Sequence, residues 1–196
     1  MKTKRAAFLD RDGVINEERP YIFRWEDFDY IPRSLDALRR LTDDPDTLVI
    51  VATGQSGIGR GKYSEADFHL LANKMRNDLL REKVIIDGIW YCPHLPAGER
   101  HRALHPYNAV CNCRKPLTGM IDDAIDYYAK QGFEIDLGSS CVIGDKTADV
   151  KLAENAGCQG ILVKTGYGGQ EKRDRYEIKP HFVAEDLYDA VDWWLR

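Results

Sequence analysis

The stretch "AAFLDRDGVIN", Ala6–Asn16, joins a short apolar run to two aspartates with one residue between them. The apolar run predicts a buried strand, and Asp12-Gly13 predicts a turn directly after it. Such a turn brings Asp10 and Asp12 toward one small volume, where two carboxylates repel each other unless a cation joins them or one is protonated. The stretch therefore indicates either a chemical site at the end of a strand or an ordinary turn.

Short β-rich runs alternate with longer segments of helical periodicity along the rest of the chain. This pattern favours an α/β fold, a Rossmann-like three-layer sandwich with a mainly parallel sheet between helices. We expect strands at residues 6–9, 48–52, 88–91, 141–143, 161–163 and 182–183. We expect helices at 34–41, 64–80, 120–130, 147–156 and 186–195, capped in three cases by Ser34, Ser64 and Thr147.

Composition narrows the classes of protein to which the chain can belong. A length of 196 residues with 43% apolar content predicts one domain, residues 1–196. The net charge of −4 is spread without a basic block, so we expect no nucleic-acid partner. No apolar run reaches the roughly 18 residues of a membrane span, and the start "MKTKR" does not lead into a signal peptide. We therefore expect a cytoplasmic monomer that does not bind membranes.

The glycine-rich stretch "IVATGQSGIGRGKYSE", residues 50–65, resembles a nucleotide-binding loop but lacks its key residues. A Walker loop needs glycine where Ser56 stands and Ser or Thr where Tyr63 stands. A dinucleotide-binding loop needs a further glycine, and a second strand that ends in an acid about 20 residues on. What remains is a turn between a strand and a helix, with Thr53 at the strand's end.

A third acid, Asp145 in "VIGDKTAD", follows another predicted strand. Ligands of open α/β sheets bind beyond the carboxyl ends of the strands, so Asp10, Asp12 and Asp145 can converge there. Three hard oxygen donors with room for water describe a magnesium site. An acid at a helix N-terminus is also ordinary, but Thr53 at a third strand end and Lys115 in "CRKP" make the set more specific.

Four further residues have the side chains of a second metal site. Cys92-x-His94 and Cys111-x-Cys113 lie sixteen residues apart, in a segment too long for an ordinary connection. Three thiolates and an imidazole suit tetrahedral zinc, with no position left open for catalysis. The alternatives are scattered thiols or a strained disulfide between Cys111 and Cys113.

Together, the motifs "FLDRDGVIN", "QSGIGRGKYSEADF", "YCPH", "CNCRKP", "VIGDK" and "LVKTGYG" resemble the haloacid dehalogenase-like phosphatases. Within them, the sequence is similar to the capless branch of heptose-bisphosphate and histidinol-phosphate phosphatases, over almost the whole chain. The resemblance implies a haloacid dehalogenase-like fold without a cap domain and phosphate-ester hydrolysis through an aspartyl phosphate. It also implies Mg²⁺ and a structural Zn²⁺ in a zinc-stapled loop.

Carried over by position, the resemblance assigns a role to each motif. Asp10 would be the nucleophile and Asp12 the general acid and base. The magnesium site would consist of Asp10, the backbone carbonyl of Asp12, Asp145 and the adjacent Lys146, and the zinc ligands would be Cys92, His94, Cys111 and Cys113. Contacts to the substrate or its phosphate would come from Glu18, Arg19, Pro20, Tyr21, Thr53, Gly54, Gln55, Ser56, Arg114 and Lys115.

The implied substrate is a small phosphorylated molecule, and the sequence favours a sugar bisphosphate. Arg114 beside the site can hold a second phosphate or a row of hydroxyls, and "QSGIGRG" and "TGYG" resemble the heptose enzymes more than the histidinol ones. The expected reaction removes the 7-phosphate of D-glycero-D-manno-heptose 1,7-bisphosphate, in the synthesis of nucleotide-heptose for lipopolysaccharide. Histidinol-phosphate hydrolysis is the alternative, and an idle zinc-binding interaction module is an alternative of another class.

Two positions depart from the pattern of the resembling family. Gly54 stands where these phosphatases usually have Asn, and Thr118 stands where they usually have Pro. Neither departure affects the nucleophile or the metal ligands. They therefore concern the choice of substrate and not the class of reaction.

Overall fold

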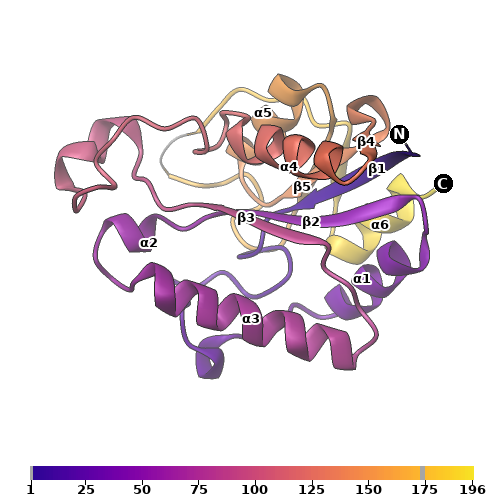
Figure 1. Ribbon diagram of the computed structural model, residues 1–196, viewed down its shortest axis with the longest axis horizontal. Helices are drawn as coiled ribbons and strands as arrows, with labels where there is room; N and C mark the ends of the chain where they lie inside the picture. The colour runs from indigo at the N-terminus through magenta and orange to yellow at the C-terminus, as the bar shows by residue number, and fades with distance from the viewer. Residues whose placement is uncertain (1, 173–174) are drawn as a thin grey trace.

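The structure, a computed structural model, describes residues 2–172 and 175–196. Its centre is a seven-stranded sheet of order β3-β2-β1-β5-β6-β7, with β4 paired to the start of β1 (Figure 1). All of these pairs are parallel. The strands are β1 Lys2–Leu9, β2 Thr47–Gly54, β3 Gly88–Cys92, β4 Phe133–Ile135, β5 Cys141–Gly144, β6 Gln159–Val163 and β7 Phe182–Ala184.

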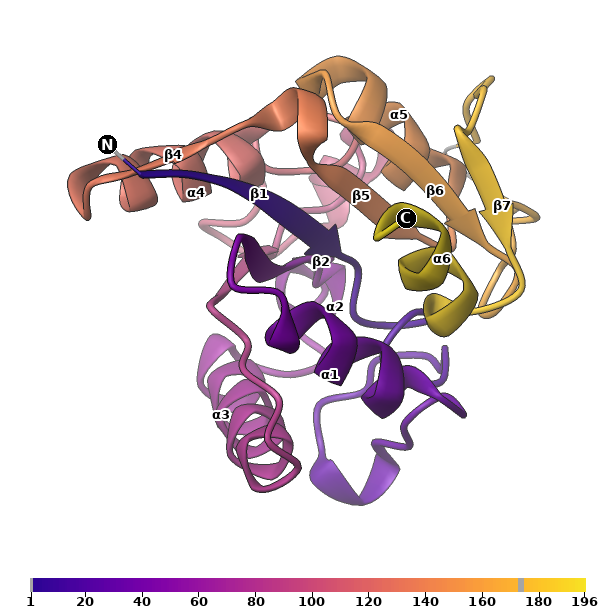
Figure 2. The same cartoon turned by 90° about the vertical axis from the view of Figure 1, so that its right-hand side faces the viewer.

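Helices cover both faces of the sheet, which confirms the predicted three-layer α/β fold. Helices α1, α3 and α6 lie on one face, and α4 and α5 lie on the other (Figures 1 and 2). The α-helices are α1 Ser34–Asp43, α2 Ser56–Gly59, α3 Glu65–Arg81, α4 Gly119–Lys130, α5 Thr147–Ala156 and α6 Leu187–Trp194. None of the described helices is long and apolar enough to cross a bilayer.

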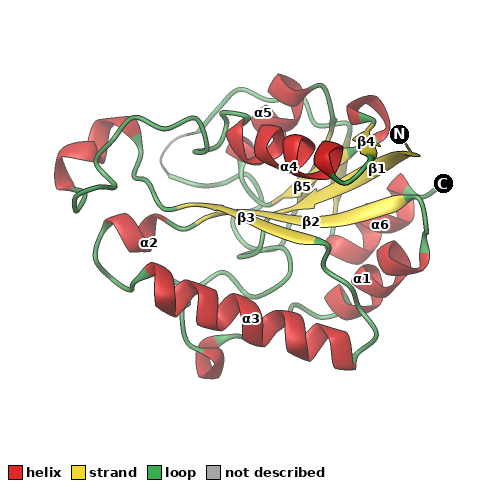
Figure 3. Cartoon of the chain, in the orientation of Figure 1, coloured by secondary structure: helices red, strands yellow, loops and turns green. Residues whose placement is uncertain are grey.

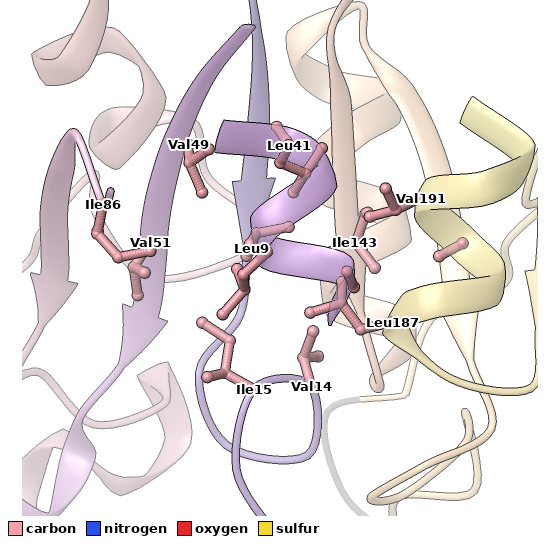
Figure 4. Packing of buried hydrophobic residues seen from close by; sticks show 14 of the residues in the cluster. Leu9, Val14, Ile15, Leu41, Val49, Val51, Ile86, Ile143, Leu187 and Val191 are labelled. Atoms are coloured by element: carbon pink, nitrogen blue, oxygen red, sulfur yellow. The ribbon is translucent and has the colours of Figure 1, made fainter. Parts of the chain in front are cut away.

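The second half of β1, residues 6–9, is buried on both faces, because it lies in the middle of the sheet. Alternate residues belong to different cores: Ala7 and Leu9 face the core under α1, α3 and α6, whereas Ala6 and Phe8 face the core under α4 and α5. Figure 4 shows Leu9 among apolar side chains from neighbouring strands and helices. Full burial of one such side chain contributes about 1.5–3 kcal/mol, so the strand that leads into Asp10 is firmly fixed.

The structure differs from the sequence-based expectations mainly in the helix caps and in two short elements. Ser64 is the N-cap of α3, as predicted: its Oγ accepts from Asp67 N at 3.1 Å. The predicted caps Ser34 and Thr147 are wrong, since each is already the first helical residue. Among the described elements, β4 and the four-residue helix α2 were not anticipated, because such short segments show no clear period.

The segment between β3 and α4 contains the expected zinc ligands. It projects beyond the sheet on the side away from the N-terminus, near α2 (Figure 3). It includes a 3-10 helix, Ala97–Arg102, and a hydrogen bond from Leu104 N to Gly59 O, 2.8 Å long, that ties it to the glycine-rich stretch. The long connection is therefore packed against the carboxyl ends of the strands.

Candidate active site

The carboxyl ends of β1 and β5 place three acidic side chains together. The two strands are neighbours in register, with Leu9 beside Ile143, so Asp10 and Asp145 emerge side by side. Carboxylate oxygens of Asp10, Asp145 and Asp149 all lie within 4.8 Å of one another, and all three residues are buried. Asp149 was not singled out from the sequence, although its place in "GDKTAD", one helical turn after Asp145, puts it on the same side of α5.

Two glycines allow the backbone to close over Asp145. Gly13 has a φ of +81°, and a Cβ there would lie 2.4 Å from Asp145 Oδ2. Gly166 has a φ of +60°, and its Cβ would lie 2.3 Å from the same oxygen. Any other residue would be strained and would collide with the carboxylate. Tyr167 N donates a 2.8 Å hydrogen bond to Oδ2, so the segment after β6 also fixes Asp145.

Two lysines neutralise part of the acidic charge. Lys115 Nζ lies 2.5 Å from Asp149 Oδ1 and 3.3 Å from Asp10 Oδ1. Lys146 Nζ lies 3.0 Å from Glu18 Oε2. When all are ionised, four carboxylates face two ammonium groups, which leaves a surplus of two negative charges.

Burial and these lysines shift the pKa values in opposite directions at different carboxyls. Burial opposes the charge of Asp10, but Lys115 and Lys146 outweigh it and hold its pKa below the usual value. Burial raises the pKa of Asp145 well above its usual value, and Lys146 offsets this only in part. Asp145 Oδ1 has no hydrogen-bond partner among the described residues. Lys146 Nζ lies 3.8 Å from this oxygen. The site therefore holds an anionic Asp10 beside a carboxyl whose charge is only partly compensated.

The Asp12 carboxylate faces a separate set of donors. Arg11 Nη2 lies 2.8 Å from Oδ1 and 2.9 Å from Oδ2, and Asn16 Nδ2 lies 2.9 Å from Oδ1. Gln55 Nε2 donates to Oδ2 at 3.1 Å and to Thr53 Oγ1 at 2.9 Å. Asp12 and Thr53, predicted from two different strand ends, are thus connected through one amide. Nothing in the sequence pattern indicated this connection.

These groups surround a cavity of about 760 Å³ at the carboxyl edge of the sheet. Eleven of the predicted site residues line it, namely Asp10, Asp12, Glu18, Arg19, Pro20, Tyr21, Gly54, Ser56, Arg114, Lys115 and Lys146. Thr53, Gln55 and Asp145 are buried in its walls instead. The lining also contains residues that were not predicted, among them Tyr63, Asp149, Tyr167 and Lys172. Tyr63 and Tyr167 lie within motifs that carry the family resemblance, but those motifs assigned no role to either residue.

Cys92, His94, Cys111 and Cys113 form a compact cluster beside the cavity. Their ligand atoms lie within 4.8 Å of one another: Cys92 Sγ is 3.9 Å from Cys111 Sγ, and Cys113 Sγ is 3.5 Å from His94 Nδ1. Tetrahedral zinc with bonds of about 2.3 Å to sulfur and 2.0 Å to nitrogen gives edges of about 3.5–3.8 Å. All of the cysteines are free thiols, so the alternative of a disulfide between Cys111 and Cys113 is wrong.

The thiols of this cluster share their protons unequally. The hydrogen bond from Cys92 lowers the pKa of Cys113 to about 5, whereas the same bond and burial raise the pKa of Cys92. A thiolate is therefore already present at neutral pH. Arg114, the residue after Cys113, donates from Nη1 to His94 O at 3.1 Å. The cluster thus holds the arginine that lines the cavity.

Comparison with known proteins identifies the family. Residues 112–190 match the HAD-hydrolase-like family. The D-glycero-D-manno-heptose-1,7-bisphosphate 7-phosphatase of Thermosynechococcus vestitus is 39% identical over 96% of this chain and 94% of its own. The D-glycero-beta-D-manno-heptose-1,7-bisphosphate 7-phosphatase of Escherichia coli is 41% identical over 100% of this chain and 90% of its own. This chain belongs to that phosphatase family.

A solved structure of the same family agrees with the fold. The D,D-heptose 1,7-bisphosphate phosphatase from B. bronchiseptica, complexed with magnesium and phosphate, superposes with a TM-score of 0.79 at 32% identity. The superposition covers 97% of this chain and 98% of that chain. The predicted resemblance to haloacid dehalogenase-like phosphatases is thereby confirmed.

We predict that Asp145→Asn stabilises the metal-free protein and abolishes its stabilisation by Mg²⁺. At neutral pH the native carboxylate is buried without full compensation, and an amide of the same shape removes that charge. A carboxyl whose pKa is raised by folding stabilises the protein at pH values below the pKa that it has in the unfolded chain. This contribution is lost as the pH rises through the pKa that the carboxyl has in the folded protein. The advantage of the variant should therefore shrink as the pH falls.

The measurement is the melting temperature with and without Mg²⁺. Stabilisation of about 1 kcal/mol raises the melting temperature by about 2–4 °C in a chain of this size. Mg²⁺ at about 100 times its Kd should stabilise the native protein by about 2.7 kcal/mol. The exposed Asp126→Asn should change neither value. An Asp145→Asn protein that Mg²⁺ still stabilises as much as the native one would contradict the assignment.

Proposed function

We propose that the chain is a magnesium-dependent phosphatase that removes the 7-phosphate of D-glycero-D-manno-heptose 1,7-bisphosphate through an aspartyl phosphate. The observation that carries this is the anionic Asp10 carboxylate, 3.3 Å from Lys115 Nζ and beside buried Asp145, at the base of the cavity. The relatives' names supply the substrate. The intact cluster argues against an idle interaction module.

The acidic cluster fits a divalent cation. Asp10, Asp145 and the backbone carbonyl of Asp12 would hold Mg²⁺, with Lys146 beside it. Asp145 Oδ1 has no hydrogen-bond partner among the described residues, and the ionised carboxylates outnumber the two lysines; these are the features that such an ion would compensate. When bound, Mg²⁺ neutralises charge on the phosphoryl oxygens and so lets a carboxylate approach phosphorus.

Asp10 would attack first. Arg11 N and Lys115 Nζ both contact its Oδ1, at 2.8 and 3.3 Å, which orients Oδ2 for attack. A bond forms between Oδ2 and phosphorus as the ester P–O bond breaks, while Lys115 and the Thr53 hydroxyl stabilise the transferred group. Asp12, as the neutral acid, gives its proton to the leaving alkoxide. Its carboxylate then takes a proton from the water that attacks phosphorus and releases phosphate and Asp10.

The part of the substrate that does not react would lie against the outer lining of the cavity. Arg19, Arg114 and Lys172 are basic residues of the cavity lining. Guanidinium groups bind phosphates and vicinal hydroxyls in a bidentate manner. This lining suits a second phosphate better than the amine of histidinol phosphate.

The Cys₃His cluster is proposed to hold a structural zinc. Its spacing fits tetrahedral coordination, and it leaves no ligand position for substrate. Such a cluster of free thiols is stable in the reducing cytoplasm, where we place the protein as a monomer with one domain, residues 1–196. The spread of charge along the chain supports a small-molecule substrate without nucleic acid or membrane partners.

Phosphate release is the direct test of the function. With Mg²⁺, we expect release from heptose 1,7-bisphosphate to exceed release from histidinol phosphate, and Asp10→Asn to lower kcat by at least about 10³-fold, as loss of a nucleophile does. The amide fits the same space but loses the ion pair with Lys115, so the melting temperature should fall modestly and the variant should remain folded. Equal or faster release from histidinol phosphate would overturn the substrate, and an active Asp10→Asn protein would overturn the mechanism.

Arg114 and Lys115 are adjacent cations to which we assign different roles. Lys115→Ala should lower kcat about 10²- to 10³-fold on every substrate, because it removes a charge that stabilises the transition state. Arg114→Ala should mainly raise KM for the bisphosphate, about ten- to a hundredfold, since a charged hydrogen bond of about 1.5–3 kcal/mol is lost. On p-nitrophenyl phosphate, Arg114→Ala should have little effect. An equal loss on both substrates would place Arg114 in the chemical step.

Zinc should copurify with the protein and depend on the cluster. We expect about one zinc per chain, lost in Cys111→Ser and retained in Cys158→Ala, which changes a buried cysteine outside the cluster. Loss of zinc should loosen Arg114 and so raise KM for the bisphosphate. The measurement is elemental analysis of protein purified reduced and without chelator. Absence of zinc from the native protein would refute the site.

A further inference from the structure

Gln55 occupies an unusual position between two groups of the site. Its side chain is 2% exposed, and its Nε2 donates to both Asp12 Oδ2 and Thr53 Oγ1, at 3.1 and 2.9 Å. It therefore faces inward and not toward the cavity. The resemblance to the family implied a substrate contact for this residue, whereas its amide contacts the two residues that would perform the chemistry.

The orientation of this amide matters, because its two ends are opposite in character. If the amide were rotated by 180°, the carbonyl oxygen would face the Asp12 carboxylate and lose the hydrogen bond. The hydroxyl of Tyr63 lies at the other end and donates to Gln55 Oε1 at 2.5 Å. A donor at this end favours the orientation in which Nε2–H points at Asp12. Tyr63 thus selects which end of the amide faces the acid.

The surroundings of Tyr63 keep its hydroxyl in place. Its ring is stacked on Phe23 with centroids 5.3 Å apart, and the residue is 8% exposed. The ring also packs directly on Gly57, where a Cβ would lie 2.2 Å from Tyr63 Cε1. Burial raises the pKa of the hydroxyl, so it remains protonated and acts as the donor.

We propose that Tyr63 is a positioning residue for the reaction, which acts through the Gln55 amide to hold Asp12 in place for proton transfer. The inference rests on the proposed function, since it takes Asp12 as the general acid and base. Arg11 and Asn16 hold Asp12 from the other side. Gln55 and Tyr63 complete this set of contacts to Asp12.

Tyr63→Phe tests the proposal, because phenylalanine keeps the stacked ring and removes only the hydroxyl. We would measure kcat/KM on heptose 1,7-bisphosphate and on p-nitrophenyl phosphate. This ratio reports the steps up to phosphorylation of Asp10. An alkoxide needs a proton to leave, whereas p-nitrophenolate does not. We expect a decrease of about two- to tenfold on the bisphosphate, the equivalent of one hydrogen bond. The value on p-nitrophenyl phosphate should stay within about twofold.

Tyr91→Phe is the matched control. Tyr91 belongs to the same aromatic cluster, but its hydroxyl meets His69 Nε2 at 3.3 Å and not the network of Asp12. This variant should match the native protein on both substrates. If Tyr63→Phe also has the kcat/KM of the native protein, the hydroxyl is idle and the proposal is wrong. If its kcat/KM falls equally on both substrates, the hydroxyl has only a structural role and the proposal is also wrong.

Asp12→Asn separates this inference from the proposed function. If Asp12 is the general acid, Asp12→Asn should reduce kcat/KM far more on the bisphosphate than on p-nitrophenyl phosphate. If that selective loss is absent, the assigned role of Asp12 is wrong. If Asp12→Asn shows this selective loss while Tyr63→Phe keeps the native kcat/KM, only the positioning role of Tyr63 is wrong. Melting temperatures of the three variants verify that each is folded.

Discussion

The burial of Asp145 between two glycines is the constraint on which the site depends. Gly13 follows β1 and Gly166 follows β6, and neither could have a Cβ without striking the Asp145 carboxylate. The contact therefore ties together the ends of three neighbouring strands, β1, β5 and β6. The turn that carries Asp10 and Asp12 can adopt only one position relative to the acid on β5. Precise placement of this kind is what catalysis by positioned charges requires.

The cost of this arrangement is electrostatic. A fully buried carboxyl that has an oxygen without a hydrogen bond, and only one lysine near that oxygen, destabilises the chain when it is ionised. The same surplus of negative charge is what attracts a divalent cation and, through that cation, a phosphate dianion. Local instability and affinity for the metal thus have the same physical origin, as is common at functional sites.

The sequence predicted the layers of the fold and the groups at the strand ends, because both follow from local patterns. Buried strands such as β1 and β2 appear as apolar runs, and the turn Asp12-Gly13 has its own signature. The predicted starts of α1 and α5 are correct, but Ser34 and Thr147 do not cap these helices. Thr147 N instead donates to Glu171 Oε1, a carboxylate from a distant segment that the local pattern could not reveal. Asp149, Gln55 and Tyr63 acquire their roles from neighbours that are remote in sequence or on other elements. Side-chain orientation of this kind is a property of packing, which a one-dimensional pattern does not contain.

The glycines of the stretch after β2 differ in how freely they can change. Gly57 is pressed against Tyr63, and Gly59 is pressed against Leu95 and the carbonyl of Pro93 in the cysteine-rich segment. Gly54, in contrast, has no atom within 4 Å of its missing Cβ, and it lines the cavity. The family resemblance leads us to expect Asn at this position. Evolution can therefore reshape the substrate side of this pocket by changing a single codon, while the neighbouring glycines hold the catalytic frame unaltered.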